Sequence, residues 1–178
     1  IALNPIMADP DYFVKLETSV GDVKLVVKPS WAPLGAKRFT ELLDAGYFDG
    51  CRFHRVVSGF IIQWGIPADP KLYKKYGDNK IKDDPVKTSN KARTISFATS
   101  GPNARGSQMF VNLDDNSSLD GQGFAPFAEV LEGFECFNSV CKDYERSGPD
   151  QQLAKEHGNK YLAKEFPKLS YIISATRC

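Results

Sequence analysis

The feature that most constrains this chain is how short its apolar segments are. The longest runs of apolar residues span only three positions, as at 25–27 and 60–62. A membrane-spanning helix needs about 20 consecutive apolar residues, so no membrane segment is expected. Short alternating segments separated by turn residues are typical of many short β-strands. We therefore expect a fold made mainly of β-strands.

Alternating apolar residues predict where these strands lie. In residues 12–18, Val14 and Leu16 share one face, and in residues 23–28 alternate positions are again apolar. Gly and Asp at 21–22 lie between the two segments, which predicts an antiparallel hairpin with one buried face. Further strands are expected at 52–57, 60–64, 94–98, 108–113, 127–131 and 169–175.

Helical spacing occurs early and late in the chain. Pro33 precedes an apolar stripe that reaches Leu43, and a short helix is expected over 134–142. Asp150 is a suitable N-cap for one late helix running toward Phe166. The strands and helices together favour a barrel with helices over its open ends.

Length and composition are those of one globular domain. The chain has 178 residues, of which 42% are apolar, and its formal net charge is +1. A domain of this size buries roughly 70% of the surface of its unfolded chain, so it needs no disulfide or metal staple. We expect a single domain over 1–178, with a core at about 12–145 and a C-terminal helix and closing strand at 150–175.

Residues 66–93 are polar and irregular, and Lys and Arg outnumber acidic residues there. We interpret this segment as a solvated loop, with a contact surface for an acidic partner as the alternative. The near-zero net charge gives no general attraction to nucleic acid or to anionic membranes. A nucleic-acid adaptor would need salt-sensitive binding by the basic residues of this loop, and no nucleic-acid partner is expected.

No metal, cofactor or disulfide is expected. His54 and His157 stand apart from any metal-ligand spacing. The chain contains no phosphate-binding loop, dinucleotide fingerprint or nucleophile elbow. Free, partly buried thiols are expected at Cys51, Cys136, Cys141 and Cys178.

The chain begins at Ile1 rather than at Met, which indicates a processed or truncated product. A removed targeting segment is compatible with this start, so the expected compartment is either the cytoplasm or the secretory pathway. The glycosylation sequon at Asn116 matters only in the second case.

Three segments carry the most information about function. Residues 53–63 contain Phe-His-Arg-Val followed by Gly-Phe and Ile-Gln, residues 101–110 contain Gly-Ser-Gln-Met-Phe, and residues 119–121 are Leu-Asp-Gly. Strand alternation brings Ile61 and Gln63 to one face. In these motifs, aromatic and aliphatic residues are interleaved with one Arg and two Gln, which suits a shallow apolar groove with a few fixed donors.

These segments resemble the cyclophilin family of peptidyl-prolyl cis-trans isomerases, and the chain looks like a divergent microbial-type member. Order and spacing agree from about residue 12 to residue 140. The resemblance implies a closed eight-stranded antiparallel β-barrel capped by two α-helices, here with an extra loop and an additional late helix. It also implies an enzyme that accelerates rotation about Xaa-Pro bonds and so assists protein folding.

The resemblance also implies site residues. Arg55 matches the catalytic arginine, expected to donate to the prolyl nitrogen, and Gln63 matches the residue that orients this arginine. His54 is expected to support the site rather than to carry a proton, because isomerisation transfers none. The matching substrate-binding positions are His54, Phe60, Ile61, Ala98, Thr99, Gly101, Gln108, Phe110, Ser118, Leu119 and Phe124.

Two departures from the family pattern concern ligand binding. Ser118 stands where cyclophilins that bind cyclosporin well usually have Trp, so cyclosporin is expected to bind with weakened affinity. Phe124 stands near the position of a common pocket histidine. Expected partners are proline-containing peptides and unfolded or loop segments of proteins, bound by a monomer. The alternative function is a proline-segment binding module of the same fold with little turnover.

Overall fold

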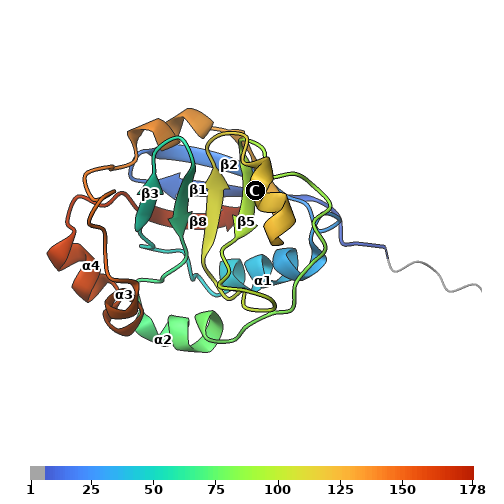
Figure 1. The fold of residues 1–178 in the computed structure, drawn as a ribbon. Coiled ribbons are helices and arrows are strands. Elements are labelled where there is room, and N and C mark those ends of the chain that lie inside the picture. Colours follow the sequence, from blue (N-terminus) through green and yellow to red (C-terminus); the bar gives the residue numbers. More distant parts are fainter. Residues whose placement is uncertain (1–6) are drawn as a thin grey trace, which may run out of the picture.

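The computed structural model describes residues 7–178, so the first six residues of the predicted domain lie outside it (Figure 1). The strands form one antiparallel sheet in the order β3-β4-β6-β5-β7-β2-β1-β8. The fold is mainly β, as predicted. The strand bounds are β1 (Tyr12–Thr18), β2 (Gly21–Val27), β3 (Arg55–Val57), β4 (Ile61–Trp64), β5 (Thr94–Phe97), β6 (Met109–Asn112), β7 (Pro126–Glu132) and β8 (Ile172–Arg177).

Helices surround the sheet. The α-helices are α1 (Pro33–Asp44), α2 (Pro70–Leu72), α3 (Gln151–His157) and α4 (Asn159–Glu165). Short 3-10 helices cover Ser117–Gln122 and Phe134–Ser139, the second within the short helix expected over 134–142. A π-helical turn covers Tyr73–Gly77. Contacts join α2 to α3 and α3 to α4, and Figure 1 shows all three at one end of the molecule.

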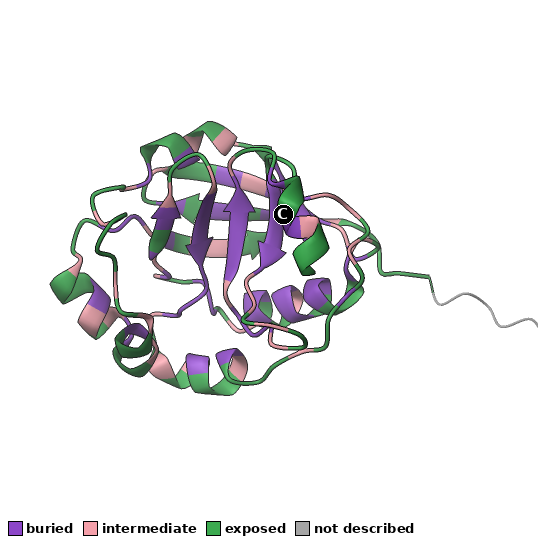
Figure 2. Cartoon of the chain, in the orientation of Figure 1, coloured by how far each residue is buried: buried purple, intermediate pink, exposed green. Residues whose placement is uncertain are grey.

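The predicted hairpin is confirmed. In its register Val14 lies opposite Leu25 and Leu16 lies opposite Val23, and all four side chains are buried. Figure 2 shows that buried residues also fill the strands at the centre of the sheet. In the hairpin one face of the sheet therefore lies in the core, as period-two alternation requires, whereas β4, β5 and β6 are buried on both faces.

Helix α1 covers this core. Its apolar stripe is buried, and the Phe39 ring lies 5.3 Å from that of Phe48 and 5.2 Å from that of Phe127 on β7, measured between ring centres. Pro33 stands at the start of the helix, where a missing backbone N–H costs nothing. The sequence prediction of this helix is confirmed.

The closed barrel was overstated, because the sheet is a curled half-barrel. Strands β3 and β8 are its two edges and do not pair with each other. A short bridge next to these strands joins the two edges: the backbone N–H of Phe53 donates to the Ser170 carbonyl at 2.9 Å, and that of Ile172 donates to the Cys51 carbonyl at 2.8 Å. The Gly50 N–H also donates to the Ile172 carbonyl, at 2.8 Å.

The single late helix was also wrong, because α3 and α4 are separate. Asp150 caps α3 as expected, its carboxylate accepting from the Leu153 N–H at 3.0 Å. The chain then turns at Gly158, which has a φ of 56° and a ψ of −139°. A Cβ there would lie 2.2 Å from the Ala68 carbonyl oxygen, so a close backbone approach interrupts the helix.

The segment 66–93, expected as a solvated loop, is exposed over much of its length but is not a plain loop. It contains α2 and the following π-helical turn, and it buries Tyr73, Asp84 and Asn90. All four cysteines, in contrast, are free thiols, as predicted. No helix within residues 7–178 is long and apolar enough to cross a membrane.

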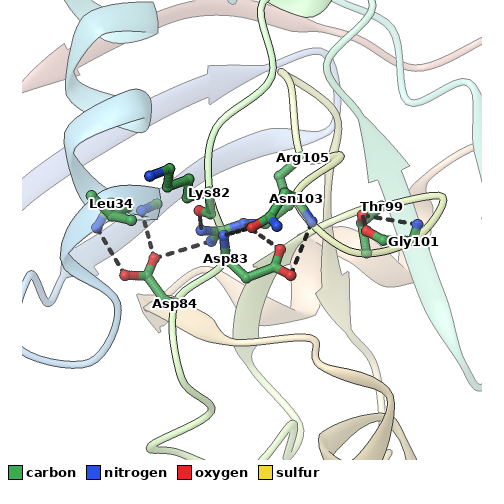
Figure 3. Close-up of polar contacts among 9 residues, drawn as sticks. Leu34, Lys82, Asp83, Asp84, Thr99, Gly101, Asn103 and Arg105 are labelled. Carbon is green, nitrogen blue, oxygen red and sulfur yellow. Dashed lines mark hydrogen bonds and ion pairs between the residues drawn. The ribbon is translucent and has the colours of Figure 1, made fainter.

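Asp84 joins three parts of the chain (Figure 3). Its carboxylate accepts from the Leu34 N–H at 3.0 Å and the Gly35 N–H at 2.8 Å, at the start of α1. The same carboxylate pairs with Arg105 Nη1 at 3.1 Å, and both side chains are 2% exposed. Because Arg105 also donates to the Lys82 carbonyl, the segment before Asp84 is held against the 99–107 loop.

Replacement of Asp84 is expected to be strongly destabilising. In Asp84→Ala, the buried Arg105 guanidinium loses its close partner and keeps only the half-exposed Asp83, 3.8 Å from its Nε, while two helix N–H groups lose their acceptor. The free energy of unfolding should therefore fall by about 3 kcal/mol. Urea unfolding measures this change. The control is Asp78→Ala at an exposed position, which should change stability by less than about 0.5 kcal/mol. Equal stability of the two variants would contradict the assignment.

Candidate active site

Strand pairing places three of the candidate residues in one row. Arg55 on β3 lies opposite Gln63 on β4, and Gln63 lies opposite Phe110 on β6. Neighbouring residues such as Val56 and Ile62 point into the core on the other face. Alternation along each strand therefore sends Arg55, Gln63 and Phe110 together to the outer face of the sheet.

An apolar pocket of about 260 Å³ opens beside this row. Ile61, Phe110 and Leu119 form a buried cluster, against which Phe60 and Phe124 pack. The Phe110 and Phe124 rings meet edge to face, with 5.6 Å between their centres. The pocket has the size and lining to hold a small apolar ring.

The Leu-Asp-Gly motif lines this pocket with Leu119, and the neighbouring Asp120 anchors the motif. The carboxylate accepts from the Asn90 backbone N–H at 2.9 Å and from its side-chain amide at 2.7 Å. The same amide donates to the Phe124 carbonyl at 2.9 Å. Burial opposes ionisation, but hydrogen bonds from Ser89 and Asn90 hold the pKa of Asp120 below its usual value. The Asn90 contacts thus fix Leu119 and Phe124 relative to the sheet.

A chain of hydrogen bonds fixes the guanidinium at the pocket rim. Arg55 Nη1 donates to Gln63 Oε1 at 3.1 Å, and Gln63 Nε2 donates to Gln108 Oε1 at 2.8 Å. His54 Nε2 lies 3.1 Å from the same Gln108 oxygen. That oxygen can only accept, so the neutral imidazole carries its proton on Nε2. Gln63 is 6% exposed whereas Arg55 is exposed, so a buried amide orients a surface cation.

His54 is held in its neutral form. Burial lowers the pKa of His54 to about 4, and its side chain is 4% exposed. A neutral imidazole with its only assigned proton engaged with Gln108 is suited to orienting neighbours rather than to exchanging protons. The geometry is compatible with the supporting role expected for this residue.

The structure brings most of the predicted site residues to one pocket. Gln108 and His54 lie behind the pocket wall, joined to Gln63 through hydrogen bonds. Gly101 lies in the adjoining loop, where its carbonyl accepts from Thr99 Oγ1 at 2.6 Å (Figure 3). Ser118 is exposed beside Leu119. The roles of these residues stay predictions. The predicted residues that line the pocket are Arg55, Phe60, Ile61, Gln63, Ala98, Thr99, Phe110, Leu119 and Phe124.

Two further residues of the site were missed by the sequence interpretation. Gln151, the first residue of α3, lines the pocket, and its Oε1 accepts from Gln108 Nε2 at 3.3 Å. Glu145 binds Ser58 in the β3–β4 turn through the backbone N–H at 2.6 Å and the hydroxyl at 2.9 Å. The N-cap at Asp150 predicts that Gln151 begins a helix, but no local sequence pattern links Gln151 or Glu145 to the site.

The site consists of hydrogen-bond donors, amides and apolar walls. Among residues 7–178, no three His, Cys, Asp or Glu side chains lie close enough together to hold a metal ion. What the arrangement can do chemically is bind a small apolar ring and present a fixed guanidinium to a polar atom next to it.

Comparison with known proteins agrees with this geometry. The family model described as "Cyclophilin type peptidyl-prolyl cis-trans isomerase/CLD" matches residues 13–157. The chain is 36% identical over 161 residues to peptidyl-prolyl cis-trans isomerase CYP18-1 of Arabidopsis thaliana, covering 86% of this chain and 97% of the relative. It is 35% identical over 153 residues to peptidyl-prolyl cis-trans isomerase A of Dickeya dadantii (strain 3937), covering 79% and 77%.

The fold agrees as well. A crystal structure of a Cryptosporidium parvum cyclophilin-type peptidyl-prolyl cis-trans isomerase, determined in the presence of the dipeptide Ala-Pro, superposes with a TM-score of 0.67 at 24% identity and covers 93% of this chain and 98% of that one. The chain belongs to the cyclophilin family. Its activity is that of a peptidyl-prolyl cis-trans isomerase.

Burial of neutral His54 predicts a pH-dependent stability. The ordinary pKa of histidine is about 6.5, so between that value and about 4 the unfolded chain binds more protons than the folded one. Stability should therefore be lost as the pH falls through this window, with His54 contributing about 3 kcal/mol of the loss.

Urea unfolding between pH 7 and pH 4 tests this contribution. His54→Gln, which keeps a donor for Gln108, should lose less stability than the wild type over that window. His157→Gln is the matched control, because it removes the other histidine at an exposed position and leaves His54 buried. Identical pH dependence in His54→Gln and the wild type would contradict the account.

Proposed function

We propose that Arg55 catalyses the isomerisation by donating a hydrogen bond to the nitrogen of the prolyl amide. The observation that carries the proposal is the guanidinium held by Gln63 at the rim of the apolar pocket, with 3.1 Å between Nη1 and Oε1. Proline would occupy the pocket formed by Ile61, Phe110 and Leu119, which places its ring nitrogen at the rim.

The chemistry of the amide explains why a donor is useful there. Rotation about the peptide bond destroys amide resonance, against a barrier of about 18–20 kcal/mol, and uncatalysed prolyl isomerisation takes tens of seconds. In the twisted state the nitrogen becomes pyramidal and its lone pair is localised. A donor aimed at this lone pair stabilises the twisted state more than either planar state, which is what catalysis requires.

The required energy is within reach of these groups. Reaching the millisecond range needs about 10⁴-fold acceleration, equivalent to about 5–6 kcal/mol. One hydrogen bond from a cation, a carbonyl oriented by Gln63 and a dry pocket can share this stabilisation. No proton changes place, which fits a neutral His54 and a permanently charged Arg55.

The proposed substrates are exposed Xaa-Pro segments of unfolded or loop regions. The pocket is open at the surface, and Thr99 and Gln151 on its rim offer polar groups to a peptide backbone. The related Cryptosporidium parvum protein was crystallised in the presence of Ala-Pro, which supports a dipeptide unit as the minimal ligand. We also propose that residues 12–175 act as one unit, because β8 pairs with β1.

Removal of the Arg55 donor is expected to abolish most of the activity. Arg55→Ala should lower kcat/KM for a Xaa-Pro peptide by about 10²-fold, the usual cost of losing a donor that acts in the transition state. Arg55→Lys should recover only part of it, because ammonium lacks the planar fork. The control Arg146→Ala removes an exposed arginine outside the site and should behave as wild type. Wild-type activity in Arg55→Ala would overturn the mechanism.

Cyclosporin is proposed to bind weakly. Ser118 is exposed beside Leu119 and supplies neither the area nor the N–H of an indole. Ser118→Trp should tighten cyclosporin binding by roughly tenfold while changing isomerisation less, as measured by calorimetry and by the peptide assay. The control is Ser117→Trp at the preceding exposed position, which should not tighten binding. Nanomolar-class affinity of the wild type would contradict this interpretation.

A further inference from the structure

A second hollow, of about 210 Å³, adjoins the proline pocket. The two share Gln63, Ala98, Thr99 and Gln151 as lining residues, so they meet along one wall. A peptide whose proline occupies the first pocket can therefore place a neighbouring side chain in the second. The proline pocket is mainly apolar, whereas the second hollow is lined mainly by polar residues.

Two lysines give this hollow its charge. Lys80, which follows the π-helical turn, and Lys155 on α3 both line it, and no acidic residue does. Within residues 7–178, no carboxylate lies within ion-pair distance of either ammonium group. The nearest acidic residues along the chain, Asp78 and Glu156, lie outside the lining, and Glu156 instead pairs with His157.

The packing holds both ammonium groups at the hollow. Lys80 Nζ donates to the Gly77 carbonyl at 2.8 Å, which leaves two of its protons free. A Cβ on Gly106 would lie 3.1 Å from Lys80 Nζ and would clash with the Gly77 oxygen. Only glycine at position 106 therefore lets this segment pack so closely against Gly77 and Lys80. Lys155 Nζ lies 5.4 Å from the centre of the Tyr73 ring.

The two positive charges act on each other. Burial lowers the pKa of Lys80, and the charge of Lys155 lowers it further, with Asp78 opposing. An anion placed between the two lysines would relieve this repulsion and would accept the free ammonium protons. The neighbouring Ser100 adds a hydroxyl group to the lining, whereas the Ser107 hydroxyl accepts from Tyr47 and donates to the Gly65 carbonyl.

We propose that this hollow is a subsite for an acidic side chain of the peptide, an Asp or Glu near the isomerised proline, bound by Lys80 and Lys155. The proposal rests on the proposed function, because it assumes that the proline occupies the adjoining pocket. It makes this cyclophilin selective for Xaa-Pro segments with a carboxylate nearby.

The experiment compares kcat/KM for paired peptides that differ only in Glu or Gln, placed in turn at each position flanking the proline. At low ionic strength the wild type should favour Glu at one of these positions by about fivefold, and added salt should reduce the preference. In Lys80→Gln/Lys155→Gln the ratio should fall toward one. The control Lys71→Gln/Lys74→Gln removes the same charge from exposed positions outside the hollow and should keep the ratio.

Three results would overturn the subsite. The first is no preference for Glu in the wild type, and the second is a preference that survives in Lys80→Gln/Lys155→Gln. The third is an equal loss in both double variants, which would indicate that the overall positive potential of this surface, and not the hollow, attracts the Glu peptide. Failure of the proposed function is a separate result. In that case the Gln peptide would be turned over equally by the wild type and by Arg55→Ala.

Discussion

The pairing of β4 with β3 on one side and with β6 on the other is the constraint on which the site depends. This register places Gln63 between Arg55 and Phe110. A slip by one residue would turn all three side chains into the core and bring Val56 and Ile62 to the surface. The buried cluster beneath these strands thus determines which groups meet the substrate.

The same register explains why a surface arginine can have one orientation. Gln63 is buried, and both ends of its amide are used, one by Arg55 and one by Gln108. Gln108 in turn contacts His54 and Gln151, so residues from just before β3, from β4 and from α3 converge on one side chain. An exposed guanidinium otherwise samples many rotamers, and this network removes that entropic cost before the peptide binds.

Much of this could be predicted from the sequence, because the signals are local. Strand alternation predicted the shared face of Ile61 and Gln63, and the motif around Arg55 indicated the family. Asp150 was identifiable as a helix cap from its residue type and its position ahead of a helical segment.

The rest depends on contacts between distant parts of the chain. Asp84 in an otherwise polar segment reads as exposed, and only its partners at the start of α1 and at Arg105 allow its burial. The break at Gly158 follows from the approach of the Ala68 carbonyl, which no helical periodicity reveals. The open edge between β3 and β8 and the lysines of the second hollow likewise depend on tertiary placement.

The central claim is that Gln63 orients Arg55 for the twisted amide. NMR exchange spectroscopy on a saturated complex with a Xaa-Pro peptide measures the cis-trans rate on the enzyme separately from binding. In Gln63→Met, which keeps the volume but removes the amide, we expect peptide affinity within a few-fold of wild type and an on-enzyme rate at least about tenfold slower. An unchanged on-enzyme rate would contradict the account.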